Sequence, residues 1–380
     1  MIIRDAIHGS IELSPIEAAA LDSKLVQRLR YVKQLSTAYL VFPSAQHTRL
    51  EHSLGAMHLS GRLCDNLGLE EPETELLRLA ALLHDVGHGA FAHDIEPLMK
   101  KHTGLNHEER GIALLRDSPV ADALYDAGFS LSALQSRMEG EKGGSMLVSD
   151  LGTDRIDYLL RDAYFTGVAY SLIDADRLLR TLVLKDGELV VTEKGRLAAE
   201  SLLVSRYFMF NVVYYHPTAR IAGAMVVKAA EQAIESGVLS AEDVMAETDE
   251  GLLLRLKSAG SSLAGRVFER RLFKKAAVVD TSQNAAAKEF FSRKSAAGEL
   301  DSVLSAAGLS REDYVACLPL PQSRKLSARL VRSDGGFEDL TANSGLMRAL
   351  EGERRESHFV LGVCEEKRVA ASRAVERLLV

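Results

Sequence analysis

The sequence contains no tryptophan, and it has no long apolar run. Aromatic residues make up 6% of its 380 residues. No stretch of about 18 residues is both apolar and uncharged, so we expect no membrane-spanning helix. The N-terminal residues "MIIRDAIHGSIEL" lack the apolar segment of a secretory signal peptide, so we expect them to belong to the mature protein. With 47% hydrophobic residues, the chain is predicted to be globular, with a sizeable core and more than one folding unit.

The chain also has few cysteines and no net positive charge. The three cysteines, Cys64, Cys317 and Cys364, are far apart in the sequence and form no C-x-x-C pair. This spacing argues against a disulfide framework or a zinc–cysteine site and favours a reducing cytoplasm. The net charge of −7 argues against general binding to nucleic acid. An anionic ligand would need a local group of arginines and lysines.

Helical periodicity dominates the first 237 residues. A short hairpin is predicted before Ser14, where Pro15 and Glu17 complete the signature of a capped helix start. The Asp186-Gly187 pair, with alternating residues on both sides, predicts a second hairpin. Apolar residues three and four apart predict helices over most of the remainder.

The pattern changes after residue 237. We predict a helical extension over 238–310, and over 311–380 a small α+β lobe with strands within 313–321, 325–341 and 358–367. The predicted fold is mainly α, with a helical catalytic domain over 1–237 and this smaller C-terminal α+β lobe.

Histidine is unusually concentrated. Eight of the eleven histidines lie between residues 47 and 107, where random scatter would place about two. Within this window, the stretch "LLRLAALLHDVGHGAFAHD" begins as a predicted buried helix. His84 and Asp85 occupy the last turn of that helix, and Gly87 and Gly89 follow it. Burying an unpaired Asp is costly, so the pair is either a hydrogen-bonded helix end or part of a metal site.

Two further residues favour a metal. His52 lies on a predicted helix whose buried side carries leucines and methionine, and Asp154 begins another predicted helix. Together with His84 and Asp85 they form a mixed nitrogen and oxygen set, which suits Mn, Fe, Mg or Zn with open positions for water or phosphate. On the second helix, Tyr158 and Asp162 share a face with Asp154. Asp157 and Arg161 are expected to form a surface ion pair.

A second group of ionisable residues follows the glycines. Gly87 and Gly89 allow a close turn, so His88 and His93 can face back over the helix end. Glu96 lies three residues after His93 and could orient its ring for proton donation, while both histidines could instead be helix caps. His107 is either a neighbour of this group or a surface residue, and Asp94 is expected to face solvent.

Anion-binding residues are less specific. Arg49, Arg155, Arg206 and Tyr214 lie near these segments, and most single arginines are solvated surface residues.

The pattern H…HD…D, formed by His52, His84–Asp85 and Asp154, resembles that of the HD-domain metal phosphohydrolases. The segments "QRLRYVKQL", "HTRLEHSLG", "HDVGHGAFAHDIE" and "DRIDYLLRD" are similar to the deoxynucleoside triphosphate (dNTP) triphosphohydrolase branch, over roughly residues 1–230. The resemblance implies one divalent metal ion held by these four residues. It also implies water attack on the α-phosphorus, releasing deoxynucleoside and triphosphate.

The resemblance also implies roles for single residues. His88, His93, Glu96 and His107 match catalytic positions, although a relative has Asp at the place of Glu96. The positions that match substrate-binding residues of the branch are Gln34, Arg49, Arg155, Tyr158, Asp162, Arg206 and Tyr214. Asp22, Gln27 and Arg30 match residues that read a guanine-nucleotide effector, while Met1 and Arg4 replace that site's Lys and Asn. The relatives are homo-oligomers, so a dimer or tetramer is expected.

Other functions fit the same residues. The metal site could serve a nucleoside monophosphate, a cyclic dinucleotide or ppGpp, and the chain could be a nucleotide-sensing module with a vestigial site.

Overall fold

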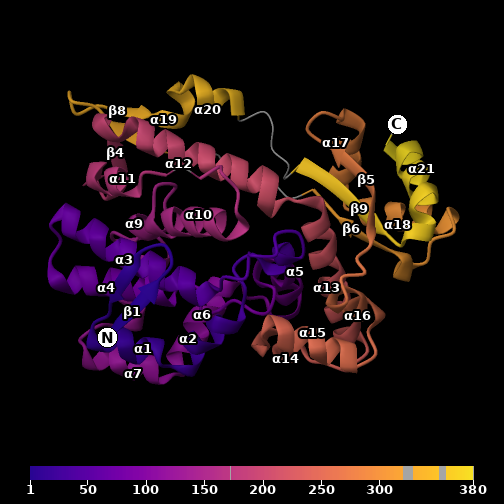
Figure 1. Ribbon diagram of the computed structural model, residues 1–380, viewed down its shortest axis with the longest axis horizontal. Coiled ribbons are helices and arrows are strands. Elements are labelled where there is room, and N and C mark those ends of the chain that lie inside the picture. Colours follow the sequence, from indigo (N-terminus) through magenta and orange to yellow (C-terminus); the bar gives the residue numbers. More distant parts are fainter. Residues whose placement is uncertain (172, 320–327, 351–356, 380) are drawn as a thin grey trace.

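The computed structural model describes residues 1–171, 173–319, 328–350 and 357–379 (Figure 1). The chain opens with the antiparallel hairpin β1 (Ile2–Asp5) and β2 (Gly9–Glu12). Helix α1 (Pro15–Leu21) then begins as predicted, because Ser14 and Glu17 exchange side-chain to backbone hydrogen bonds in a capping box. The second predicted hairpin is also confirmed: Asp186 and Gly187 both have positive φ, as the tight turn between β3 and β4 requires.

The predicted mainly helical fold is confirmed. Its core is formed by α3 packed against α4 and α10, with apolar side chains that are almost fully buried. The helical elements before residue 170 are α2 (Lys24–Arg28), η1 (Leu29–Tyr31), η2 (Ser36–Leu40), α3 (Arg49–Leu67), α4 (Glu71–Leu83), α5 (Ala92–Thr103), α6 (His107–Arg116), α7 (Pro119–Asp126), α8 (Leu131–Met138), α9 (Ser145–Val148) and α10 (Thr153–Thr166).

A second apolar cluster surrounds helix α13, which Figure 1 shows between the helical core and the C-terminal strands. It includes Phe91 at the start of α5 and Met245 at the end of α14. The later helical elements are α11 (Ala175–Thr181), η3 (Glu193–Gly195), α12 (Arg196–Met209), the π-helix η4 (Phe210–Tyr214), α13 (Pro217–Glu235), α14 (Ala241–Ala246), α15 (Asp249–Ser258), α16 (Ser262–Phe268), α17 (Ala285–Ser292), α18 (Ala296–Ala306), η5 (Arg311–Asp313), α19 (Leu340–Asn343), α20 (Gly345–Leu350), η7 (Glu365–Lys367) and α21 (Arg368–Leu379).

Two further sheets join distant parts of the chain. One has the order β3 (Leu182–Lys185), β4 (Glu188–Thr192), β7 (Arg329–Val331) and β8 (Phe337–Asp339). The other has the order β5 (Lys274–Asp280), β9 (His358–Val363) and β6 (Tyr314–Cys317), and α18 and α21 pack with it around a third apolar cluster. The predicted strands after residue 311 are confirmed where the structure describes them; residues 320–321 and 325–327 of the predicted segments lie outside the described residues.

The predicted helical extension over 238–310 also contains the strand β5, which was not predicted. This strand pairs with β9, about 80 residues further along the chain, and that long-range partner leaves no local signal in "KKAAVVD". The division at 237 and 310 stays a prediction. Strand pairing links both sides of each boundary, because β4 pairs with β7 and β5 pairs with β9.

Candidate metal and phosphohydrolase site

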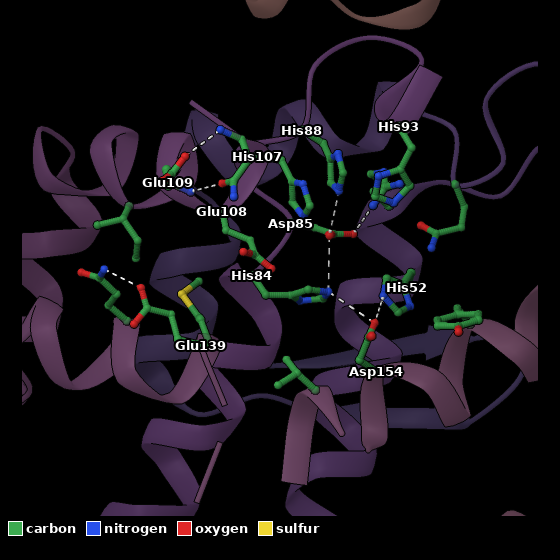
Figure 2. Close-up of a pocket in the computed structure, with 18 residues that line it drawn as sticks. His52, His84, Asp85, His88, His93, His107, Glu108, Glu109, Glu139 and Asp154 are labelled. Carbon is green, nitrogen blue, oxygen red and sulfur yellow. Dashed lines mark hydrogen bonds and ion pairs between the residues drawn. The ribbon is translucent and has the colours of Figure 1, made fainter. Parts of the chain in front are cut away.

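Three helices bring the predicted metal-binding residues together. His52 comes from α3, His84 and Asp85 follow the end of α4, and Asp154 lies in the first turn of α10. Nε2 of His52 lies 3.0 Å from Oδ1 of Asp154, and Nε2 of His84 lies 3.4 Å from Asp85 and 3.6 Å from Asp154 (Figure 2). These spacings fit donor atoms that share one ion at bonds of about 2.1 Å. His52, His84 and Asp85 form a group that could hold a metal ion.

The outer nitrogens of both histidines are already engaged. Nδ1 of His52 lies 2.8 Å from Oδ2 of Asp157, and Nδ1 of His84 lies 2.7 Å from the carbonyl oxygen of Ala81. Each acceptor places the ring proton on Nδ1, so the lone pair of Nε2 faces the other donor atoms. This is the arrangement that metal-binding histidines adopt, and the four residues therefore fit a divalent ion.

Charge is concentrated at this cluster. Burial opposes the charged form of His52, but hydrogen bonds to Asp154 and Asp157 outweigh it and raise its pKa to about 10. Burial opposes the charge of Asp85 as well, and Arg49 with His84 and His88 holds its pKa well below the usual range. A cation at this place would replace the ring protons, because metal binding needs neutral imidazoles and ionised carboxylates.

The expected ion pair between Asp157 and Arg161 forms, at 3.0 Å, but its predicted place at the surface is wrong. Both side chains are fully buried, and Asp157 accepts hydrogen bonds from Arg161 and contacts Nε2 of His8 at 2.6 Å. Arg161 in turn donates to Asp5 on β1. The spacing of four residues does place both side chains on one face of α10, but that face packs inward against α3 and the hairpin. Gly55 on α3 makes this possible, because a Cβ there would lie 1.9 Å from an oxygen of Asp157.

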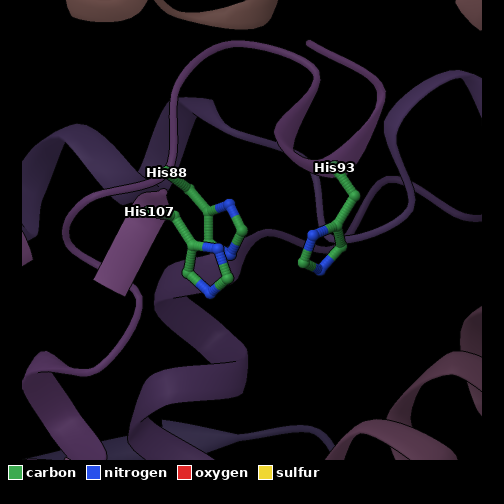
Figure 3. Close-up of side chains that lie close together, drawn as sticks. All are labelled: His88, His93 and His107. Atoms are coloured by element: carbon green, nitrogen blue, oxygen red, sulfur yellow. The ribbon is translucent and has the colours of Figure 1, made fainter. Parts of the chain in front are cut away.

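His88, His93 and His107 form a second cluster beside the first. The rings of His88 and His107 stack with centroids 3.9 Å apart, and His93 faces them edge-on at 4.7 Å from His88 (Figure 3). Glu96 contacts Nδ1 of both His93, at 3.1 Å, and His107, at 2.5 Å. Burial opposes the charge of Glu96, but these two histidines lower its pKa well below the usual range.

The two clusters meet at Asp85. Nε2 of the buried His88 lies 3.3 Å from Oδ1 of Asp85, and burial together with nearby Arg49 lowers the pKa of His88 well below its usual value. Asp94, which was expected to face solvent, instead turns inward. Its carboxyl group hydrogen-bonds to Ser36, and a Cβ on Gly223 of α13 would lie 2.4 Å from its Oδ2. Residue 94 lies on the side of α5 that packs on α13, which the sequence alone did not indicate.

A cavity of about 430 Å³ joins both clusters. Of the predicted substrate-binding residues, Gln34, Arg49 and Tyr158 line it, and Arg49 donates to Asp85 at 2.7 Å. Its other end is lined by residues that sequence reasoning missed: Asn106, Glu108, Glu109, Ile112, Gln135, Met138, Glu139 and Val148. Most of these come from α6 and α8, whose sequences carry no feature beyond ordinary amphipathic helices.

The remaining predicted substrate-binding residues lie outside that lining. Arg155 and Arg206 both pair with Asp150, which follows α9. Asp162 contacts His47 at 2.8 Å and accepts a hydrogen bond from the hydroxyl of Tyr214 at 2.6 Å. Asp162 therefore holds Tyr214 in place in this structure.

The predicted effector residues lie on the surface around α2. Asp22 and Arg30 are exposed, and the Arg30 guanidinium donates to Oε1 of Gln27. These residues do not line the cavity.

Two family matches cover most of the chain. Residues 49–162 match the HD domain, and residues 173–379 match the HD associated region. The fold and the H…HD…D site thus define a helical metal phosphohydrolase. The chain belongs to the HD-domain phosphohydrolase family, in the form that carries the HD associated region.

Known proteins are similar over different lengths. A hypothetical protein from Aquifex aeolicus has a solved structure with TM-score 0.79, 30% identity and 99% of both chains covered. An uncharacterized Methanocaldococcus jannaschii protein is 37% identical over 72% of this chain and 58% of its own length. The Dictyostelium discoideum homolog of deoxynucleoside triphosphate triphosphohydrolase SAMHD1 is 31% identical over 61% of this chain and 49% of its own. This chain thus matches about half the length of these two relatives.

Among the described residues, we find no helix with the length and apolar character needed to span a membrane.

Proposed function

We propose that this protein hydrolyses deoxynucleoside triphosphates to deoxynucleoside and inorganic triphosphate. The observation that carries the proposal is one cavity in which a four-residue metal site adjoins a histidine held by a carboxylate, His93 beside Glu96. The similarity to a protein named as a dNTP triphosphohydrolase supports this substrate class.

His52, His84, Asp85 and Asp154 would hold one divalent cation, whether Mn, Mg, Fe or Zn. When bound, such an ion polarises a phosphate oxygen and lowers the pKa of a coordinated water. Asp157 and the carbonyl oxygen of Ala81 would keep both histidine rings oriented.

The chain's own residues would then supply the proton for the leaving group. A water oxygen bonds to the α-phosphorus and loses a proton to solvent, the bond from that phosphorus to the sugar O5′ breaks, and O5′ takes a proton from His93, which regains one from solvent. Glu96 orients the His93 ring and also fixes His107, while the buried His88 faces Asp85. The side chain of His93 is 66% exposed, so it can reach a substrate that enters from solvent.

Positive charge would bind the triphosphate. Arg49 lines the cavity, and Arg155 and Arg206 would leave Asp150 to bind phosphate oxygens. We assign Gln34 and Tyr158, which line the cavity, to binding the sugar and the phosphates of the substrate. Tyr214 is held in position by its hydrogen bond to Asp162. A homo-oligomer, and a guanine-nucleotide effector at Asp22, Gln27 and Arg30, remain part of the proposal.

A nucleotide panel tests this function. The protein is incubated with dGTP, dATP, dTTP and dCTP, with and without GTP, in the presence of Mn²⁺, and the products are separated by anion-exchange chromatography. We expect triphosphate and deoxynucleoside from at least one dNTP. If the protein hydrolyses only nucleoside monophosphates, cyclic dinucleotides or ppGpp, the proposed substrate class is wrong. Nucleotide binding without turnover would indicate a nucleotide sensor.

A further inference from the structure

The loop that carries His88 is held by side chains that link it to the HD associated region. Residues 86–91, here called the His88 loop, connect the turn of His84 and Asp85 to α5, and they have no regular secondary structure. Three successive carbonyl groups of this loop accept hydrogen bonds from two arginines. Arg28 donates to Val86 and His88, and Arg110 donates to Gly87 at 2.7 Å.

The same two guanidinium groups reach the HD associated region. Arg28 donates to the carbonyl oxygen of Glu247 at 3.3 Å, and Arg110 donates to that of Met245 at 3.0 Å. Met245 lies in the last turn of α14, and Glu247 directly follows that helix. Each guanidinium therefore connects the His88 loop to a segment more than 130 residues later in the chain.

Asp249 provides the third connection. It is the first residue of α15, and only 2% of its surface is exposed. Its Oδ1 accepts the backbone N–H of Phe91 at 2.7 Å, and its Oδ2 accepts that of Lys33 at 2.8 Å. Lys33 precedes Gln34, which lines the cavity, and Phe91 lies between the cavity-lining His88 and His93, so a single carboxylate fixes two backbone segments next to the site.

The backbone at Phe91 needs such a restraint. Phe91 and Ala92 have φ values of 54° and 43°, in the left-handed region that costs free energy for residues other than glycine. Such a conformation persists only where the surroundings impose it. The Asp249 carboxylate and the burial of the Phe91 ring in the second apolar cluster provide that constraint.

We propose that Asp249 is a positioning residue, through which the HD associated region holds the His88 loop and the Lys33–Gln34 segment in the geometry that hydrolysis needs. Arg28 and Arg110 complete this connection. The inference rests on the proposed function for its effect on rate, whereas its effect on the loop needs no substrate. The metal-binding residues lie outside 86–91, so their ion should stay bound when Asp249 is replaced.

Two variants of Asp249 and one neighbour test the proposal. Asp249→Ala removes both acceptors, and Asp249→Asn keeps the shape but leaves only one oxygen to accept. Glu250→Gln is the matched control, because Glu250 is adjacent on α15 and carries the same charge, but its partner is the side chain of Lys33. Hydrogen exchange of the Lys33 and Phe91 amides, metal content, kcat and KM are measured for each.

We expect exchange at Phe91 and Lys33 to accelerate at least tenfold in Asp249→Ala. We also expect kcat to fall at least tenfold while KM and metal content stay within twofold of the wild type. Glu250→Gln should match the wild type in all four measurements. Asp249→Asn should fall between the two. If Asp249→Ala does not fold, Asp249→Asn decides on the same measurements.

The proposal would be overturned if a folded Asp249 variant kept wild-type amide exchange and kcat. It would also be overturned if Glu250→Gln lost as much kcat as Asp249→Ala, or if neither Asp249 variant folded. A wild-type protein that exchanges as expected but hydrolyses no dNTP would end the proposed function alone. In that case faster amide exchange in Asp249→Ala would still establish that Asp249 holds the loop.

Discussion

Nδ1 of His52 lies 2.8 Å from Oδ2 of Asp157, and neither side chain has more than 2% exposure to solvent. This contact links the predicted metal site to a buried network that continues through Arg161 to Asp5 on the N-terminal hairpin. The hairpin thus closes the buried network that orients the His52 ring.

Asp157→Asn should weaken metal binding by about 10- to 100-fold, the usual cost of losing an outer-sphere carboxylate. The amide is neutral and has one oxygen, so it cannot serve His52, His8 and Arg161 together. Isothermal titration with Mn²⁺ measures the effect. Asp176→Asn is the control, since Asp176 pairs with Arg62 at an exposed site and its loss removes the same charge. Unchanged affinity in Asp157→Asn would contradict the assignment of this network.

Asp154→Ala and His93→Ala should separate metal binding from proton donation. Asp154 contacts both metal-site histidines, so its removal should abolish both bound metal and turnover. His93 belongs to the second cluster, and its alanine variant should keep the metal while losing about 10²- to 10⁴-fold in rate. Elemental analysis and initial rates check both. Full metal content in Asp154→Ala would show that the ligand set is wrong.

Glu96→Gln should destabilise the protein in a pH-dependent way. The pKa of Glu96 is lowered in the folded state from its ordinary value of 4.5, because burial is outweighed by its contacts with His107 and His93. A lowered carboxyl pKa means that stability is present above pH 4.5 and is lost as the pH falls below it. At pH 7 the loss should be about 1.5–3 kcal/mol, as for hydrogen bonds to charged groups.

Urea unfolding of both proteins at pH 7 and pH 3.5 measures that difference. The gap between wild type and Glu96→Gln should narrow at the lower pH, where protonation of the wild-type carboxyl group becomes favourable in the unfolded chain. A gap that stayed constant or widened would be inconsistent with an ionised Glu96 between the two histidines.

Gly87→Ala should be strongly destabilising. A Cβ at this position would lie 1.8 Å from the carbonyl oxygen of His107 and 2.5 Å from the backbone nitrogen of Gly111, so backbone must move. The expected cost is about 3 kcal/mol, the upper part of the range for overpacking. Gly265→Ala is the control, because nothing lies within 4 Å of its added Cβ inside α16. It should be neutral or stabilising by up to about 1 kcal/mol. Thermal unfolding that ranks the two variants the other way would contradict the packing at the His88 loop.

Local sequence patterns predicted the helical core and the convergence of the metal-site residues. The Ser14–Glu17 capping box and the Asp186-Gly187 turn depend on interactions within a few residues, so the sequence specified them directly. His52, His84, Asp85 and Asp154 were predicted from residue type and from a family pattern, and the packing of α3, α4 and α10 brings them together.

Long-range contacts account for what the sequence did not indicate. Asp157 and Asp94 turn inward because α10 and α5 each pack a second face against the core, and spacing alone does not show which faces are covered. Asp249 resembles an ordinary helix-start residue in the sequence. Its two backbone partners are 216 and 158 residues away, so only the folded chain reveals them.

The most direct test of the central claim is hydrolysis of a dNTP in H₂¹⁸O, with mass spectrometry of both products. Attack of water on the α-phosphorus with cleavage of the bond to O5′ predicts one ¹⁸O in the triphosphate and none in the deoxynucleoside. Release of deoxynucleoside monophosphate with pyrophosphate, of single phosphate, or of ¹⁸O-labelled deoxynucleoside would contradict the account.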